Sequence, residues 1–147
     1  MGEQVVITGM GAVTPIGIGV ENFWKALIDG VRGVEPIARF DVTDLPVKFA
    51  GCVKDFNPEQ FMPKKLTREM DLFMQYGYAA AEEALTDAGL NPDNIEERKV
   101  PAERIGIVVG TAYAGIATIA ETQDGISTGA HSKVSPRFVP KIIGNVA

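Results

Sequence analysis

The sequence predicts an α/β domain, in which helices cover a sheet of short buried strands. Two apolar runs, residues 5–8 and 105–109, are rich in β-branched side chains, and each is followed directly by glycine. Neither run alternates apolar with polar residues, which favours strands that are buried on both faces. Between the runs, apolar and small side chains recur at helical spacing over residues 67–88. Strands that alternate with helices are typical of a sheet with helices on its faces.

The first half of the chain contains one further helix and one further strand. Apolar side chains recur at helical spacing at Val20, Trp24, Leu27, Ile28 and Val31. Glu21 and Asn22 favour the start of this helix, and Gly30 favours its end. Residues 47–53 form a weaker strand candidate. The segment FNPEQFMPKK follows, and its two prolines and lack of period predict a loop.

The helix expected over residues 67–88 carries a narrow stripe of apolar and small side chains. They are Met70, Phe73, Met74, Gly77, Ala81, Ala84, Leu85 and Ala88. Helical spacing alone explains the methionines and aromatics of this stripe as core residues. Because the stripe is rich in small residues, we expect this helix to pack closely against other backbone. Gly89 stands where glycine commonly ends a helix.

The last third of the chain is rich in Gly, Ala, Ser and Thr over residues 111–134, with a short helix expected at about residues 116–123. Ser135-Pro136 and Pro140 then favour a helix start, because proline is tolerated in a first turn. The apolar pattern of this last helix runs to the final residue without a stop signal, through Ile142, Ile143, Val146 and Ala147. We therefore expect a chain that is cut within a helix.

Composition limits the classes of function. The chain has 147 residues, which favours one domain, and it is 46% hydrophobic with a net charge of −5. An acidic chain argues against a general nucleic-acid binder. One cysteine and one histidine exclude an internal disulfide and a Cys/His zinc site. The N-terminus resembles neither a signal peptide nor a membrane span, so we expect a cytoplasmic protein without a membrane anchor.

The glycine-rich stretch VVITGMGAVTPIG raises the question of a nucleotide site, and its spacing argues against one. A dinucleotide-binding turn needs a third glycine at position 14, which is Thr14, and Pro15 prevents the immediate helix start. The chain also lacks the Gly-Lys pair of a phosphate-binding loop and the G-x-S-x-G turn of hydrolases. We expect these glycines to serve tight turns and close packing.

The single cysteine and the single histidine have ordinary structural interpretations. Cys52 lies within a strand candidate among small and apolar neighbours, where a thiol acts as a small hydrophobe. Lys54, on the same face of that strand, is the one neighbour that favours a reactive thiolate. His131 lies in a loop of small residues, which favours a surface position. From its residues alone, the chain shows no complete catalytic set.

Seven segments in order resemble the N-terminal part of the β-ketoacyl-[acyl carrier protein] synthases of the thiolase superfamily, synthase II type. They are VVITGMGAVTPIG, FWKALIDGVRGV, RFD, KFAGCVKDFNPE, REMDLFMQYGYAAAEEALTDAGL, RIGIVVGTAYAG and SPRFVPKIIGNVA. The resemblance implies a thiolase-like αβαβα layered fold, of which residues 1–147 supply most of the N-terminal half. It also implies a homodimer, and it implies no cofactor and no metal.

The resemblance implies an acyltransferase of fatty acid elongation, which condenses an acyl thioester with malonyl-[acyl carrier protein] and releases carbon dioxide. An active-site cysteine and two histidines carry this chemistry in the family, through covalent catalysis and oxyanion stabilisation. Cys52 does not match that cysteine, and the catalytic residues follow the helix that starts near Ser135. The segment by itself is therefore expected to be inactive. Two alternatives are a polyketide ketosynthase and its non-catalytic chain-length factor, and a small nucleotide-binding module is disfavoured by the failed glycine motif.

The resemblance also implies functional residues within this chain. Lys64, Lys65 and Arg68 match a basic patch that docks acyl carrier protein, an acidic partner that exposed basic side chains attract. Glu69 stands where relatives can have another basic residue, so the patch is expected to be weaker here. Without this role, the three residues form an ordinary solvated helix start.

Two aromatic residues match the acyl pocket of the family. Tyr113 matches a residue that limits chain length, and its bulk favours shorter acyl chains. Phe138 matches a residue of the dimer interface that reaches the acyl pocket of the partner subunit. The structural alternative for Tyr113 is an aromatic side chain packed within its loop.

Overall fold

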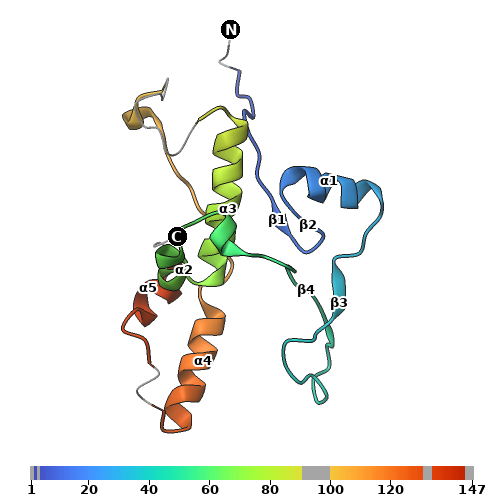
Figure 1. Cartoon of the computed structure of the whole chain (residues 1–147), viewed down its shortest axis with the longest axis vertical. Coiled ribbons are helices and arrows are strands. Elements are labelled where there is room, and N and C mark those ends of the chain that lie inside the picture. The colour runs from blue at the N-terminus through green and yellow to red at the C-terminus, as the bar shows by residue number, and fades with distance from the viewer. Residues whose placement is uncertain (1, 3, 91–99, 131–133, 145–147) are drawn as a thin grey trace. The chain divides into compact units, whose positions relative to one another are not determined.

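The computed structural model describes residues 2, 4–90, 100–130 and 134–144 (Figure 1). Its strands are β1 (Val13–Thr14), β2 (Gly17–Ile18), β3 (Val34–Pro36) and β4 (Phe49–Gly51). Its α-helices are α1 (Val20–Ile28), α2 (Lys64–Glu69), α3 (Leu72–Asp87), α4 (Ile116–Ser127) and α5 (Phe138–Ile142). The chain divides into two compact units, residues 1–57 with 80–90 and residues 58–79 with 91–147, so that α3 contributes to both.

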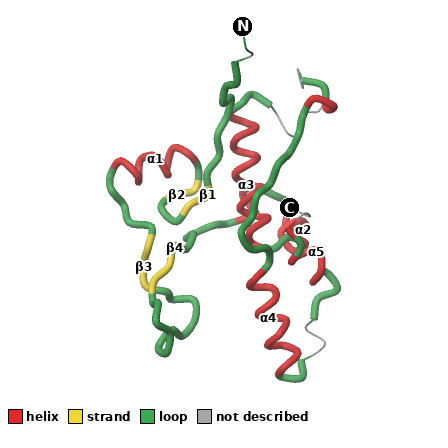
Figure 2. The backbone as a smooth tube through the Cα atoms, turned by 180° about the vertical axis from the view of Figure 1, so that it is seen from behind, coloured by secondary structure: helices red, strands yellow, loops and turns green. Residues whose placement is uncertain are grey.

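The strands of the first unit form two small antiparallel hairpins (Figure 2). β1 pairs with β2 across a two-residue turn, in which the Thr14 hydroxyl donates to the Gly17 carbonyl at 2.9 Å. β3 pairs with β4, and Val34 lies opposite Gly51. β4 confirms the strand expected within residues 47–53, at a shorter length, whereas the sequence pattern did not predict its partner β3.

Helix α1 confirms the helix expected from the apolar spacing that begins at Val20. It ends at Ile28, and Gly30 follows with a φ of 68°, a left-handed conformation that glycine adopts without strain. At its other end, Gly19 has a φ of 86° and no side chain with which to cap the helix. Trp24 and Ile28 are exposed, so the apolar stripe of α1 does not form a core within this chain.

The part of α3 that belongs to the first unit packs directly against the N-terminal glycines. A Cβ added at Gly9 would collide with the carbonyl oxygen of Ala84, and one added at Gly11 would collide with that of Ala80. Only glycine permits such an approach of two backbones. The expectation that this helix packs closely on other backbone is confirmed, as is the packing role of these glycines.

In the second unit, the single helix expected over residues 67–88 is wrong at its start, because two helices occupy this region. The backbone of Met70 is extended, which ends α2 at Glu69, and α3 begins at Leu72. The side-chain amide of Gln75 stabilises this break by donating to the carbonyls of Thr67, at 3.0 Å, and Met70, at 3.2 Å. Gly89 ends α3 with a φ of 70°, as expected.

The core of the second unit is small. Met62, Met74 and Ala79 are buried, which confirms Met74 as a core residue of the helical stripe. Two further helices complete this unit, and α4 packs against α5. α4 begins at Ile116, as expected, and continues to Ser127.

The two buried strands expected at residues 5–8 and 105–109 are wrong for the structure of this chain. Neither run pairs with another strand among the described residues, and both are exposed: Val5 is 96% exposed, Ile7 82% and Val108 98%. A strand is stabilised by backbone hydrogen bonds to its neighbours, and no strand that the structure describes supplies them to these runs. The pattern therefore identifies segments with the composition of buried strands, but composition alone does not provide the neighbouring strand.

Helix α5 confirms the helix start expected after Ser135-Pro136, with Pro140 in its first turn. The expected continuation of this helix to the last residue is wrong at Ile143, whose backbone is extended. Gly144 then lies against Thr111 and Ala114, where an added Cβ would be 3.1 Å from the Thr111 Cγ2. Val146 and Ala147 lie outside the described residues.

Candidate functional site

Two carboxylates on α3 hold the segment that follows the N-terminal glycines. The side chain of Glu83 accepts hydrogen bonds from the backbone N–H groups of Ala12, at 2.9 Å, and Val20, at 2.7 Å. One turn later, Asp87 accepts from the N–H of Met10 at 3.0 Å. An acidic pair on a helix is usually solvated, but Glu82 and Glu83 are both half-buried here. The partners of Glu83 lie more than 60 positions away, so the local sequence carried no signal of its role.

A hollow of about 990 Å³ lies in the first unit beside these carboxylates. Its lining is mostly apolar and includes Met10, Phe23 and Trp24, together with the two carboxylates, Glu83 and Asp87. Tyr113 and Phe138, the side chains expected in an acyl pocket, do not line it. The hollow is therefore distinct from the pocket that the family resemblance implies.

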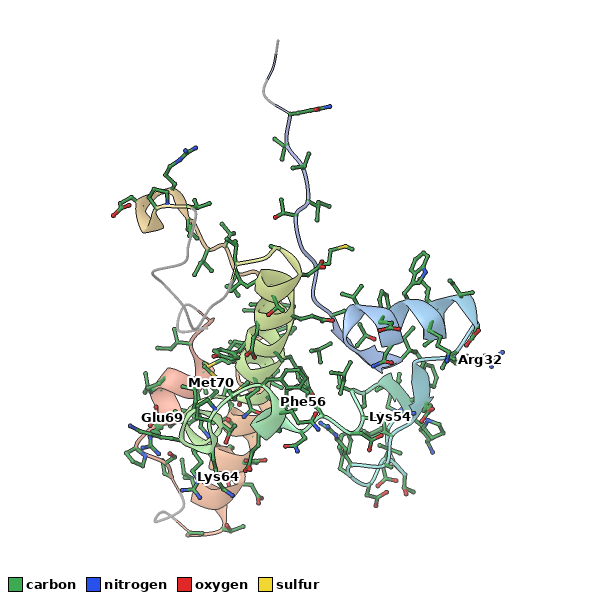
Figure 3. All side chains as sticks on the ribbon, turned by 45° about the horizontal axis from the view of Figure 1, so that its top comes forward. Arg32, Lys54, Phe56, Lys64, Glu69 and Met70 are labelled. Atoms are coloured by element: carbon green, nitrogen blue, oxygen red, sulfur yellow. The ribbon has the colours of Figure 1, made fainter. Side chains whose placement is uncertain are left out.

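The three basic residues expected to dock a carrier protein all lie on α2. Lys64, Lys65 and Arg68 are all exposed. Lys64 forms an ion pair with Glu59 at 3.2 Å, so its charge is partly neutralised within the chain. Lys65 and Arg68 form no ion pair with another described residue. On α2, these two side chains therefore carry the positive charge that no described residue pairs with. Figure 3 shows Lys64 and Glu69 on the same helix.

The corner between α2 and α3 is fixed by buried polar contacts. Asp71 lies between the two helices and is buried, and the Thr118 hydroxyl of α4 donates a hydrogen bond to its carboxylate. Its backbone carbonyl accepts from the N–H of Gln75 at 3.1 Å. Aspartate is a favoured residue immediately before a helix. Asp71 was thus a signal within the sequence that a new helix begins at this point.

The structure brings together the segments that carry Tyr113 and Phe138. Gly115, two residues after Tyr113, is buried against the backbone of Lys141 and Ile142, and Phe138 begins that same helix, α5. Tyr113 itself is 78% exposed, whereas Phe138 is half-buried. The interpretation of Tyr113 as a packed loop aromatic is therefore wrong within this chain.

The remaining candidates contribute no catalytic group to the described residues. Cys52 directly follows β4 and is half-buried, and His131 lies outside the described residues. Within the part of the chain that the structure describes, no three His, Cys, Asp or Glu side chains are grouped so as to hold a metal ion. The same residues include no helix with the length and apolar character that crossing a bilayer requires.

Comparison with known proteins identifies close relatives along the whole chain. Residues 2–147 match the family "Beta-ketoacyl synthase, N-terminal domain". The chain is 44% identical to 3-oxoacyl-[acyl-carrier-protein] synthase 2 of Vibrio cholerae and 43% identical to the same enzyme of Vibrio harveyi. Each match covers 98% of this chain and 34% of the relative, so the chain spans about a third of the length of these relatives.

A solved structure shows the same fold. The ishigamide ketosynthase/chain length factor superimposes with a TM-score of 0.75 at 32% identity, over 94% of this chain and 33% of the other. A β-ketoacyl synthase from Burkholderia phymatum matches with the same TM-score at 25% identity, over 96% of this chain and 34% of the other. These matches confirm the expected thiolase-like α/β fold class. The chain therefore belongs to the β-ketoacyl synthase family, and it corresponds to the N-terminal domain of that family.

Proposed function

We propose that this chain forms the N-terminal, carrier-docking third of a 3-oxoacyl-[acyl-carrier-protein] synthase that elongates fatty acids. The observation that carries this proposal is the 44% identity to synthase 2 of Vibrio cholerae across nearly the whole chain. The reaction is a decarboxylating condensation of an acyl thioester with malonyl-[acyl carrier protein]. We use the term intact synthase for a polypeptide that contains this chain and has the length of the relatives. The intact synthase is expected to act as a homodimer in the cytoplasm.

The contribution of this chain to the reaction is to receive the carrier protein and to shape the acyl site. Lys65 and Arg68 lie exposed on a short helix whose far end is fixed by the buried Asp71. A rigid basic surface attracts an acidic carrier and orients it, which raises the rate of productive encounter. Covalent attachment of the acyl group falls to a cysteine outside this segment, because Cys52 has neither the place nor the surroundings of a nucleophile.

Charge reversal of Lys65 and Arg68 in the intact synthase tests this role. We expect Lys65→Glu together with Arg68→Glu to raise KM for acyl-[acyl carrier protein] about tenfold, because attraction to the acidic carrier becomes repulsion. Turnover of a short acyl thioester without the carrier should not change. Lys64→Glu is the matched comparison within the same helix, and its effect should be smaller, since Glu59 already neutralises Lys64. An equal loss with both substrates would contradict docking at this surface.

We also propose that Tyr113 limits the length of the acyl chain. Support comes from the family resemblance and from its exposed side chain, which is free to line a pocket completed by other parts of the synthase. Tyr113→Gly in the intact synthase should shift the preferred substrate toward longer acyl chains, by about two to four carbons, because the removed ring leaves space for additional buried methylenes. Competition between acyl thioesters of increasing length measures this shift, and an unchanged profile would refute it.

A second candidate function is that of a polyketide ketosynthase or its chain-length factor. The specific observation in its favour is the 32% identity and matching fold of the ishigamide ketosynthase/chain length factor. The two candidates differ at the residue that occupies the position of the family's cysteine in the intact polypeptide. A cysteine there supports the condensing enzyme, and a glutamine supports the chain-length factor.

A further inference from the structure

An ion pair joins the docking helix α2 to α5, a helix that the sequence pattern did not connect with it. The guanidinium of Arg137, the residue that immediately precedes α5, lies 3.5 Å from the carboxylate of Glu69 at the end of α2. Figures 1 and 2 show α2 and α5 side by side. The two residues are 68 positions apart, so this contact appears only in the folded chain.

The pair changes the electrostatics of the docking surface. Glu69 on its own would repel an acidic partner and would weaken the attraction of Lys65 and Arg68 beside it. Arg137 cancels this charge at short range. Lys141 lies one helical turn further along α5, since its N–H donates to the Arg137 carbonyl at 3.2 Å, and it adds a second cation to the same helix. In a chain with a net charge of −5, the basic side chains Lys65, Arg68, Arg137 and Lys141 on and beside these two helices therefore outnumber the single carboxylate of Glu69.

The geometry of Arg137 leaves it able to contact a partner. Its side chain remains 54% exposed, and the contact with Glu69 engages one terminal nitrogen, Nη2. A guanidinium has five N–H donors in a planar fork, so the others are available for a second carboxylate. An ion pair with this exposure contributes little to folding stability, which makes a purely structural role a weak explanation for it.

We propose that Arg137 is a docking residue for the acidic carrier protein and that it extends the basic surface of α2 onto α5. This inference rests on the proposed function, because it assumes that α2 receives the carrier. It goes beyond that function by assigning to Arg137 both the neutralisation of Glu69 and a direct contact with the partner's carboxylates. The negative charge that Glu69 places on α2 is thereby neutralised from a different helix.

Charge reversal at Arg137 in the intact synthase tests the inference. Arg137→Glu should raise KM for acyl-[acyl carrier protein] about fivefold, because it leaves the charge of Glu69 without its cation and adds a second negative charge. Turnover of a short acyl thioester should stay unchanged, which also shows that the variant folds. Arg137→Lys should retain most of the wild-type KM. Arg104→Glu is the matched control: it makes the same charge change at an exposed residue that forms no ion pair within the described residues, and it should have no effect.

The outcomes separate this inference from the function on which it rests. If Lys65→Glu with Arg68→Glu raises KM for the carrier and Arg137→Glu behaves like Arg104→Glu, the inference is overturned while docking on α2 stands. If neither variant affects the carrier, docking on α2 and the inference both fail. A rise in KM with both substrates would identify Arg137 as a structural residue and would also overturn the inference. Raising the ionic strength should shrink the Arg137→Glu effect, because salt screens exposed charges.

Discussion

Replacing Gly11 by alanine is expected to lower the free energy of unfolding of the chain by about 3 kcal/mol, because the new methyl group has no space. The Cβ would overlap the carbonyl oxygen of Ala80 and would lie 2.7 Å from the Ala80 carbonyl carbon and 3.0 Å from the Ala84 nitrogen. All three atoms belong to the backbone of α3, so no side-chain rotation relieves the clash. Urea unfolding followed by far-ultraviolet circular dichroism measures the change.

Gly77→Ala is the matched control for this prediction. Gly77 lies within the same helix, and an added Cβ there meets no atom within 4 Å. Alanine in an open helix interior is more stable than glycine by about 0.5–1 kcal/mol, so this variant should be slightly stabilised. Equal effects of the two substitutions would show that α3 does not pack on the glycine segment as the structure describes.

The contrast between these glycines shows what the sequence could predict. The stripe of small residues indicated that the helix after residue 67 packs against backbone, and this is confirmed at Ala84 and Ala88, which lie against Gly9. Ala80, which the stripe did not include, makes the same close approach to Gly11. The same stripe included Gly77, which is exposed. Helical periodicity identifies one face of a helix but does not say how much of that face is covered, because coverage depends on segments distant in the sequence.

Strands were predicted less well than helices for the same reason. A helix forms its hydrogen bonds within its own segment, so spacing and end signals were sufficient to place α1, α4 and the start of α5. A strand needs a neighbour, and the apolar runs at residues 5–8 and 105–109 have none among the described residues. The hairpin partner of β4 was missed because Val34–Pro36 lacks a recognisable strand pattern in so short a segment.

Of the residues in the candidate site, some could be predicted from the sequence and others could not. The basic residues of α2 could be identified because they are adjacent in the sequence and match a family motif, and the structure shows them exposed. Arg137 could not be identified, since only the fold brings it to Glu69. Glu83 could not be identified for the same reason: an acidic pair on a helix is usually solvated, and only the distant backbone N–H groups that donate to Glu83 show its role.

Glu83→Ala is expected to lower the free energy of unfolding by about 2–4 kcal/mol, because it leaves two part-buried backbone N–H groups without an acceptor. One of them, on Val20, belongs to the first residue of α1. Helix starts need an acceptor for such N–H groups, and Gly19 has no side chain to supply one. Glu83 therefore caps α1 from another helix, and its negative charge also complements the positive end of the α1 dipole.

Glu21→Ala provides the control. It also removes one negative charge near the start of α1, where Glu21 lies in the first turn, but it leaves the hydrogen bonds of Glu83 intact. Its cost should be about 0.3–1 kcal/mol, the usual contribution of an acid to the helix dipole. Amide hydrogen exchange distinguishes the two roles: protection at Ala12 and Val20 should fall in Glu83→Ala and persist in Glu21→Ala. If exchange at these two amides were unchanged in Glu83→Ala, some other group would be holding the glycine segment and the start of α1. If it falls, the stability of this unit depends on one carboxylate that joins α3 to two points of the N-terminal segment, each more than 60 positions away in the sequence.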